Sequence, residues 1–254
     1  MAPGRFTSVE WVAETGSTNT DLVARAARSS GESLQELVLV TDHQTAGRGR
    51  LSREWLAPPG QNLLLSVLTV PRCPPSRWPL ATSAMAVAVA EAAATLGVAD
   101  VGIRWPNDVV VGGEAPGKLA GVLAELVTDA SGPIAAVVGL GLNVAWPVDA
   151  EVRSSLVATS LAACLDAVPE RRAVLGLVVD EFARVLAFVE TDPGRLRALH
   201  IARSATVGRD VRVARADGTN LEGRAVDIDE AGRIVVRTAG GDEALSAGDV
   251  THLR

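Results

Sequence analysis

Gln44-Thr45-Ala46-Gly47-Arg48-Gly49-Arg50 is the stretch around which we interpret the rest of this sequence. It follows a short apolar run, residues 37–40, which predicts a buried strand that ends before the loop. The two glycines let the backbone approach a ligand closely. Each arginine offers a planar set of donors suited to carboxylate or phosphate oxygens. The stretch therefore predicts a loop that holds an anion.

The composition is that of a folded protein with a large core. Of the 254 residues, 48% are hydrophobic and 21% are charged, which excludes global disorder. The net charge of -6 argues against nucleic acid as the main partner. Cys73, Cys164 and three scattered histidines do not have the spacing of a structural zinc site.

The ends and apolar segments of the chain predict no membrane attachment. The first ten residues lack the apolar core of a signal peptide. Residues 81–101 are alanine-rich and interrupted by polar side chains, so they indicate a buried helix rather than a membrane span. We therefore expect a cytoplasmic protein.

Lys118 is the only lysine of the chain, among 24 basic residues. At most exposed positions arginine can replace lysine as a solvated charge. A lysine that remains can mark a position where a compact ammonium is required, because the two side chains differ in shape and hydrogen-bond geometry. The alternative is chance survival. We favour a functional role for Lys118.

The order of the periodic segments predicts an α+β fold. Strands are expected over residues 11–15, 37–40, 62–70, 101–105, 118–126 and 134–138, and helices over 77–96, 155–165, 169–190 and 194–202. After Ser204, short β-rich segments over 211–214, 223–228 and 234–237 alternate with turns, as in a small barrel. We expect one domain over residues 1–203 and a second over 204–254.

Two polar clusters follow predicted strands. Ser17-Thr18-Asn19 precedes an amphipathic stretch, where Ser17 or Thr18 could cap a helix; three short polar side chains are more than a cap requires. Asn107-Asp108 follows Pro106, and a simple turn would by itself account for this pair. The functional interpretation of the second cluster is a nucleotide and magnesium site.

Two phosphate-binding signatures are only partly present, and each lacks a residue that its function requires. Residues 112–118 have the glycine spacing and lysine of a nucleotide-binding P-loop, but Leu119 stands where a hydroxyl must bind magnesium. The following residues also predict a strand rather than a helix. Gly47-x-Gly49 begins a dinucleotide fingerprint, but Ser52 replaces its third glycine. We reject both.

Five motifs in this order resemble those of biotin–protein ligases (biotin–[acetyl-CoA-carboxylase] ligases) over nearly the whole chain. They are Ser17-Thr18-Asn19, the Gln44–Arg50 loop, Trp105-Pro106-Asn107-Asp108, Gly117-Lys118-Leu119-Ala120-Gly121 and Gly139-Leu140-Gly141-Leu142-Asn143. The resemblance implies a mixed β-sheet catalytic domain of the biotin/lipoate ligase type and an SH3-like C-terminal domain. It also implies that ATP and Mg²⁺ activate biotin as biotinyl-5'-AMP, which then biotinylates a lysine of a biotin carboxyl carrier domain.

The resemblance assigns roles to these residues. Lys118, Arg48 and Arg50 would be catalytic, because fixed positive charge offsets the repulsion between a carboxylate and ATP. The residues implied to bind biotin are Ser17, Thr18, Asn19, Gln44, Arg48, Gly49, Arg50, Trp55, Lys118, Gly121 and Gly141. Those implied to bind ATP are Arg50, Trp105, Asn107, Asp108, Lys118 and Asn143, and Asp108 would also bind Mg²⁺.

The sequence departs from the family pattern at three places. Ser52 replaces a common glycine of the loop, and Arg104 replaces a common lysine, which suggests that this position needs only a cation. The catalytic pattern begins near Trp11 and leaves no room for an N-terminal helix-turn-helix domain. We therefore expect no DNA binding, no membrane partner, and a monomer or weak homodimer.

Two alternatives stay open at this point. A lipoate or octanoate ligase shares the fold and the adenylate chemistry. Its acyl substrate lacks the ureido group of biotin and so needs no hydrogen-bond partners for one. A non-catalytic biotin sensor would have less need of Lys118. The glycine-arginine loop and the Trp-Pro-Asn-Asp turn favour biotin ligation.

Overall fold

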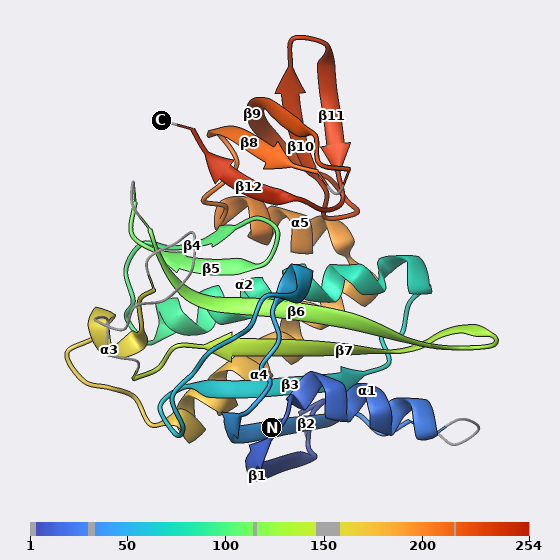
Figure 1. Ribbon diagram of the computed structural model, residues 1–254, viewed down its shortest axis with the longest axis vertical. Helices are drawn as coiled ribbons and strands as arrows, with labels where there is room; N and C mark the ends of the chain where they lie inside the picture. Colours follow the sequence, from blue (N-terminus) through green and yellow to red (C-terminus); the bar gives the residue numbers. More distant parts are fainter. Residues whose placement is uncertain (1–3, 30–33, 114–115, 146–157, 216, 254) are drawn as a thin grey trace.

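The structure, a computed structural model, describes residues 4–29, 34–113, 116–145, 158–215 and 217–253 (Figure 1). Its larger part is built on a seven-stranded sheet with the order β1-β2-β3-β7-β6-β5-β4. The strands are β1 (Val9–Thr15), β2 (Leu37–Gln44), β3 (Leu63–Thr69), β4 (Val101–Arg104), β5 (Asp108–Val111), β6 (Gly117–Asp129) and β7 (Gly132–Leu142). β1 is parallel to β2 and the other neighbours are antiparallel, so the sheet is mixed, as expected.

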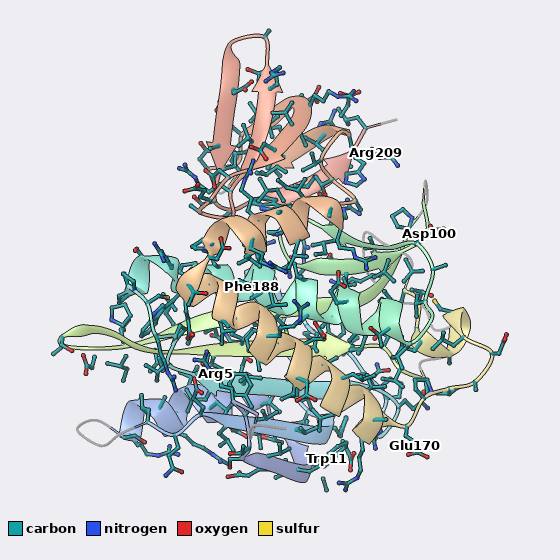
Figure 2. All side chains as sticks on the ribbon, turned by 180° about the vertical axis from the view of Figure 1, so that it is seen from behind. Arg5, Trp11, Asp100, Glu170, Phe188 and Arg209 are labelled. Carbon is teal, nitrogen blue, oxygen red and sulfur yellow. The ribbon has the colours of Figure 1, made fainter. Side chains whose placement is uncertain are left out.

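Helices cover both faces of this sheet. α1 (Thr18–Arg28) lies on one face, and α2 (Ala81–Thr95) and α4 (Arg171–Thr191) lie on the other, where Figure 2, seen from behind, shows α4 with Phe188 crossing in front of the strands. β2 illustrates the consequence: Val38 and Val40 belong to the core under α2 and α4, whereas Leu39 belongs to the core under α1. Successive strand residues point to opposite faces. A continuous apolar run is therefore required here.

The helix expected over residues 77–96 is divided. A 3₁₀ helix, η2 (Pro75–Leu80), comes first, and the α-helix begins only at Ala81. Pro79 lacks the N–H that an α-helix interior needs and is tolerated only near a helix start. α2 is buried on most sides, as predicted. Within the described ranges, no helix is long and apolar enough to span a membrane.

β2 is longer than the apolar run suggested. It continues through Thr41 and His43 to Gln44, because these residues pair with β1. Gln44 is therefore the last residue of a strand rather than the first of a loop. The η1 turn (Arg50–Ser52) lies within the loop that follows.

Of the three helical segments after β7, the first is shorter than expected. α3 spans only Leu161–Cys164, and residues 155–157 of the predicted helix lie outside the described part. α4 and α5 (Pro193–Ala202) agree with the predictions within a few residues. Residues 203–205 then hydrogen-bond to Ile103 of β4, and the chain passes to the second sheet.

The second sheet is antiparallel, with five strands in the order β11-β10-β9-β8-β12. The strands are β8 (Asp210–Ala214), β9 (Asn220–Ile228), β10 (Ile234–Thr238), β11 (Gly241–Leu245) and β12 (Asp249–His252). The sequence predicted the first three, and the small C-terminal β domain is confirmed. β11 and β12 were missed because their short, polar sequences carry little strand signal. Figure 1 shows this sheet packed beyond α5, near β4 and β5.

Candidate active site

A cavity of about 640 Å³ is lined by residues of the central strands β3, β6 and β7, of the loops beside them and of β12. Its volume is in the range of small-molecule sites. Every residue that the sequence analysis proposed for biotin, ATP or catalysis lines it. The C-terminal domain contributes Asp249, Val250 and Thr251. The motifs, spread over more than a hundred residues of sequence, are therefore gathered around one cavity, although their individual roles remain predictions.

One end of the cavity is a buried polar pocket. Ser17 is the N-cap of α1 by position, as expected, but its side chain makes no capping hydrogen bond. The backbone N–H of Thr18 donates to Gln44 Oε1 at 2.9 Å. Thr18 Oγ1 lies 2.7 Å from Ser66 Oγ, and Ser66 Oγ donates to Asn19 Oδ1 at 2.6 Å. These side chains are held in fixed orientations, as a ligand with donors and acceptors requires.

Glycines form the floor next to this pocket. A Cβ atom on Gly139 would lie 2.2 Å from Asn19 Oδ1, and one on Gly141 would lie 2.2 Å from Trp55 Cε2. A Cβ on Gly121 would lie 2.8 Å from Trp55 Cζ3. The backbone of β6 and β7 is therefore bare where Trp55 and Asn19 pack against it. This explains the glycines at positions 121, 139 and 141.

The arginines of the loop are anchored in three directions. Arg48 Nη1 donates to Glu125 Oε1 of β6 at 3.2 Å. Arg50 donates to Asn107 Oδ1 at 3.2 Å and to the carbonyl oxygen of Gly248 at 3.4 Å. Arg53 forms an ion pair with Asp249 of β12. The loop thus touches the sheet, the turn after β4 and the C-terminal domain.

Burial makes this region favourable for anions. Loss of hydration lowers the pKa of Arg50 below its ordinary value, and the neighbouring Asp249 and Asp108 only partly oppose this. Burial also lowers the pKa of Arg104, whose Nη2 donates to the carbonyl oxygen of Val250 at 2.5 Å. A bound carboxylate or phosphate would stabilise the charged guanidinium and so oppose the effect of burial on its pKa. The predicted anion preference of the loop therefore has a physical basis.

Lys118 lies where β6 begins. Its Nζ is 2.7 Å from Asp108 Oδ1 and 5.3 Å from the centre of the Trp55 ring. The side chains of Lys118 and Asp108 are 22% and 21% exposed, so the pair is open to the cavity. An ammonium here can contact an anionic ligand and keep its carboxylate partner.

Two of the proposed ATP-binding residues have their polar groups engaged with protein. The amide of Asn143 donates to the carbonyl oxygens of Lys118 and Thr159 and accepts from Asn62. The Trp105 indole packs into the C-terminal core and donates to the carbonyl oxygen of Gly232 at 3.0 Å. Both line the cavity, so their observed polar contacts favour shaping it over binding a ligand through hydrogen bonds.

The donor set suits magnesium only together with a ligand. Within the described part of the chain, no cluster of three or more His, Cys, Asp or Glu could hold a metal ion. Mg²⁺, however, is commonly bound by one or two carboxylates plus substrate phosphates. Asp108 provides one such carboxylate inside the cavity.

Sequence analysis missed several residues around the cavity. Ser66 lies within the apolar strand β3, and Glu125 lies on β6. Glu125 shares the parity of Gly121 and Leu123 along the strand, a signal that could have placed it on the cavity side. Asp249 had no local signal, because it comes to the site from the far end of the chain.

The chain was compared with known families and proteins. Residues 11–143 match the Biotin/lipoate A/B protein ligase family, and residues 206–253 match the Biotin protein ligase C terminal domain. The biotin–[acetyl-CoA-carboxylase] ligase of Mycobacterium tuberculosis is 41% identical over 248 residues, covering 96% of this chain and 88% of the relative. That of Paracoccus denitrificans is 30% identical, covering 94% and 98%.

A solved structure gives the same result. The biotin protein ligase from Aquifex aeolicus in complex with biotin and ATP matches with a TM-score of 0.77 and 26% identity, covering 98% of this chain and 100% of that one. The fold and the sequence matches agree. The chain belongs to the Biotin/lipoate A/B protein ligase family and, by its C-terminal domain, to the biotin protein ligases within it.

Proposed function

We propose that this protein activates biotin with ATP as biotinyl-5'-AMP and transfers the biotinyl group to a lysine of a biotin carboxyl carrier domain. One observation carries this proposal. A buried polar pocket for a neutral head group and a set of cations, Arg48, Arg50 and Lys118, line the same cavity. A ligand with a polar ring at one end and a carboxylate at the other fits this arrangement.

The first step joins two anions. A carboxylate oxygen of biotin attacks the α-phosphorus of ATP, and the bond to the β,γ-diphosphate breaks to release pyrophosphate. Lys118 and Arg50 would stabilise the negative charge that develops at phosphorus, and Arg48 would hold the carboxylate. Such preorganised charges act more strongly in a cavity that excludes water.

The second step transfers the acyl group. The amine of the carrier lysine attacks the acyl carbon, the C–O bond to AMP breaks, and an amide forms with loss of a proton. Lys118, next to that bond, would stabilise the leaving phosphate. We infer that the carrier approaches beside the exposed residues Leu51 and Leu56, of which Leu56 lines the cavity.

Asp108, with Asn107 beside it, would hold Mg²⁺ together with the nucleotide phosphates. When bound, the ion would neutralise phosphate charge and orient the leaving pyrophosphate. Lys118 Nζ lies 2.7 Å from the same carboxylate, so the lysine and the ion would share this position.

Biotin is favoured over the alternatives by two observations. The relatives from Mycobacterium tuberculosis and Paracoccus denitrificans, which match over 96% and 94% of this chain, are biotin–[acetyl-CoA-carboxylase] ligases, which also supports a carboxylase carrier as partner. The pocket of Thr18, Asn19, Gln44 and Ser66 offers hydrogen bonds that a lipoyl ring cannot use. A non-catalytic sensor would not need Lys118 and Asp108 in the lining of the cavity.

The remaining proposals concern organisation. We place the domain division at residues 203 and 204, since α5 ends at Ala202 and β8 begins at Asp210. We propose no DNA or membrane partner, a cytoplasmic location, and a monomer or weak homodimer.

A transfer assay tests the function. The purified chain is incubated with Mg-ATP, a carrier domain, and biotin, lipoate or no acid. Mass spectrometry should find the carrier heavier by one biotinyl group only with biotin. Lipoyl transfer would support the lipoate ligase, and biotin binding without any transfer would support the sensor.

A further inference from the structure

Glu125 is a charged residue on β6 that the reaction just described does not use. Side chains alternate along a strand, so Glu125 points to the same side as Gly121 and Leu123, which line the cavity. Its side chain is 27% exposed and lies just beyond the cavity wall. A partly buried carboxylate at this place needs partners.

Its partners are two residues of the proposed biotin site. Glu125 Oε1 accepts from Arg48 Nη1 at 3.2 Å, and Glu125 Oε2 accepts from Asn19 Nδ2 at 2.8 Å. Arg48 belongs to the glycine-arginine loop and Asn19 to the first turn of α1. One carboxylate therefore joins the residue that faces the ligand's anionic end to one that faces its head group.

This contact also fixes the direction of a buried hydrogen-bond chain. Asn19 Nδ2 donates to Glu125 and to the carbonyl oxygen of Leu123 at 3.1 Å, and an ionised carboxylate and a carbonyl can only accept. Asn19 Oδ1 must then face Ser66, whose hydroxyl donates to it. The Thr18 hydroxyl lies 2.7 Å from Ser66 Oγ and donates to Gln44 Oε1 at 3.2 Å, which links this chain to the end of β2.

The chain closes on the loop at both ends. Thr18 binds Gln44 through its backbone N–H, and Arg48 stands four residues after Gln44. Asn19 and Ser66 are 4% and 0% exposed, so water cannot replace a missing partner. Glu125 thus contributes to the orientation of Asn19, together with the carbonyl oxygen of Leu123, and to the position of Arg48.

We propose that Glu125 is a positioning residue for biotin activation, which couples the head-group pocket at Asn19 to Arg48 of the loop. Glu125 does not touch the reacting atoms; it acts through Arg48. The inference rests on the proposed function, because it concerns the binding of biotin at this site.

Glu125→Gln separates the two contacts. A glutamine oxygen can still accept from Asn19, whereas its amide nitrogen cannot accept from Arg48. In biotin-dependent pyrophosphate exchange, the KM for biotin should rise about threefold to tenfold, a modest change because the Arg48 side chain is half-exposed and screened. The KM for ATP and the Tm should stay unchanged. Unchanged biotin kinetics with a lower Tm would overturn the proposal in favour of a purely structural role.

A second comparison tests the route through Arg48. In an Arg48→Ala background, Glu125→Gln should have no further effect on the KM for biotin, because the partner is already absent. An equal loss in both backgrounds would contradict the proposal. Glu222→Gln, which removes the partner of Arg212 on the C-terminal sheet, is the matched control and should behave as the unmodified protein.

The two levels of inference fail differently. If the unmodified protein shows no biotin-dependent pyrophosphate exchange, the proposed function is wrong. If it is active and Glu125→Gln is indistinguishable from it, only the role of Glu125 is wrong.

Discussion

Lys118 Nζ lies 2.7 Å from Asp108 Oδ1 and faces the Trp55 ring at 5.3 Å from its centre. The chain's single lysine, which lines the cavity, is therefore held from two sides. The Asp108 carboxylate holds its ammonium in place, and an aromatic face limits its rotation. The same Asp108 is the proposed magnesium ligand, so Lys118 would contact the phosphate from beside the carboxylate that holds the ion.

Lys118→Arg should lose most activity although the charge is kept. The planar guanidinium is larger than an ammonium, and Lys118 packs closely over Gly121, where a Cβ would lie 3.3 Å from Nζ. We expect the rate of adenylate formation to fall by about 100-fold or more, as for other misplaced electrostatic groups. Pyrophosphate exchange measures this. Activity close to that of the unmodified protein would contradict a specific need for lysine.

Gly141→Ala should weaken biotin binding without unfolding the protein. Its Cβ would lie 2.2 Å from Trp55 Cε2, so the indole has to move away from the cavity wall. Isothermal titration should show weaker binding of biotin. Gly176→Ala is the control: no atom lies within 4 Å of its added Cβ, and in α4 it should stabilise the fold by about 0.5–1 kcal/mol. Equal biotin affinity of both variants would exclude this role for Gly141.

Asp249→Asn should affect ATP more than biotin. Asp249 anchors Arg53, and its charge favours the buried guanidinium of Arg50. Loss of this anchor should raise the KM for ATP about threefold to tenfold, the scale of a partly exposed ion pair near a site. Asp242→Asn, which removes an exposed ion pair with Arg237 in the same domain, is the control. A lower KM for ATP would show instead that Asp249 competes with the phosphates.

His200 should make the fold sensitive to acid. It is 1% exposed, and burial lowers its pKa to about 4. In the unfolded state the histidine has a pKa near 6.5 and binds a proton more readily than in the fold. The free energy of unfolding that depends on a neutral His200 is therefore fully present above pH about 6.5 and is lost as the pH falls toward 4. The full loss is on the order of 3 kcal/mol.

His200→Leu should flatten this dependence. Neither ring nitrogen has a hydrogen-bond partner among the described residues, so an apolar side chain sacrifices no observed contact. Urea unfolding at pH 7.5 and pH 5 should show a smaller loss of stability for the variant. His252→Asn tests the other histidine whose pKa is lowered to about 4, by burial and by Arg104 and Arg209. An unchanged slope in His200→Leu would assign the acid sensitivity elsewhere.

Much of the site could be predicted because its chemistry is concentrated at strand ends. Glycines, arginines and short polar residues next to apolar runs, such as Gly47 to Arg50 and Asn107-Asp108, are costly or unnecessary in a plain turn. Their order along the chain carried the family resemblance. The fold class followed from strands and helices of ordinary periodicity.

The rest depended on distant contacts. Glu125 and Ser66 lie inside strands, and their role becomes recognisable only when α1 packs against the sheet and brings Asn19 to them. Asp249 reaches the loop from β12, about 200 residues later in the sequence. The extension of β2 to Gln44 requires β1 as a neighbour, and β11 requires β10. Local propensity could not supply these pairings.

The rarity of lysine has a practical consequence for chemistry on this protein. A reagent that acylates amines finds one side chain in the whole chain, and that side chain lies inside the cavity. Besides the N-terminal amine, each added mass therefore reports on the occupancy of a single position. Protection of Lys118 from acylation by a bound ligand can therefore be measured from the mass of the intact chain.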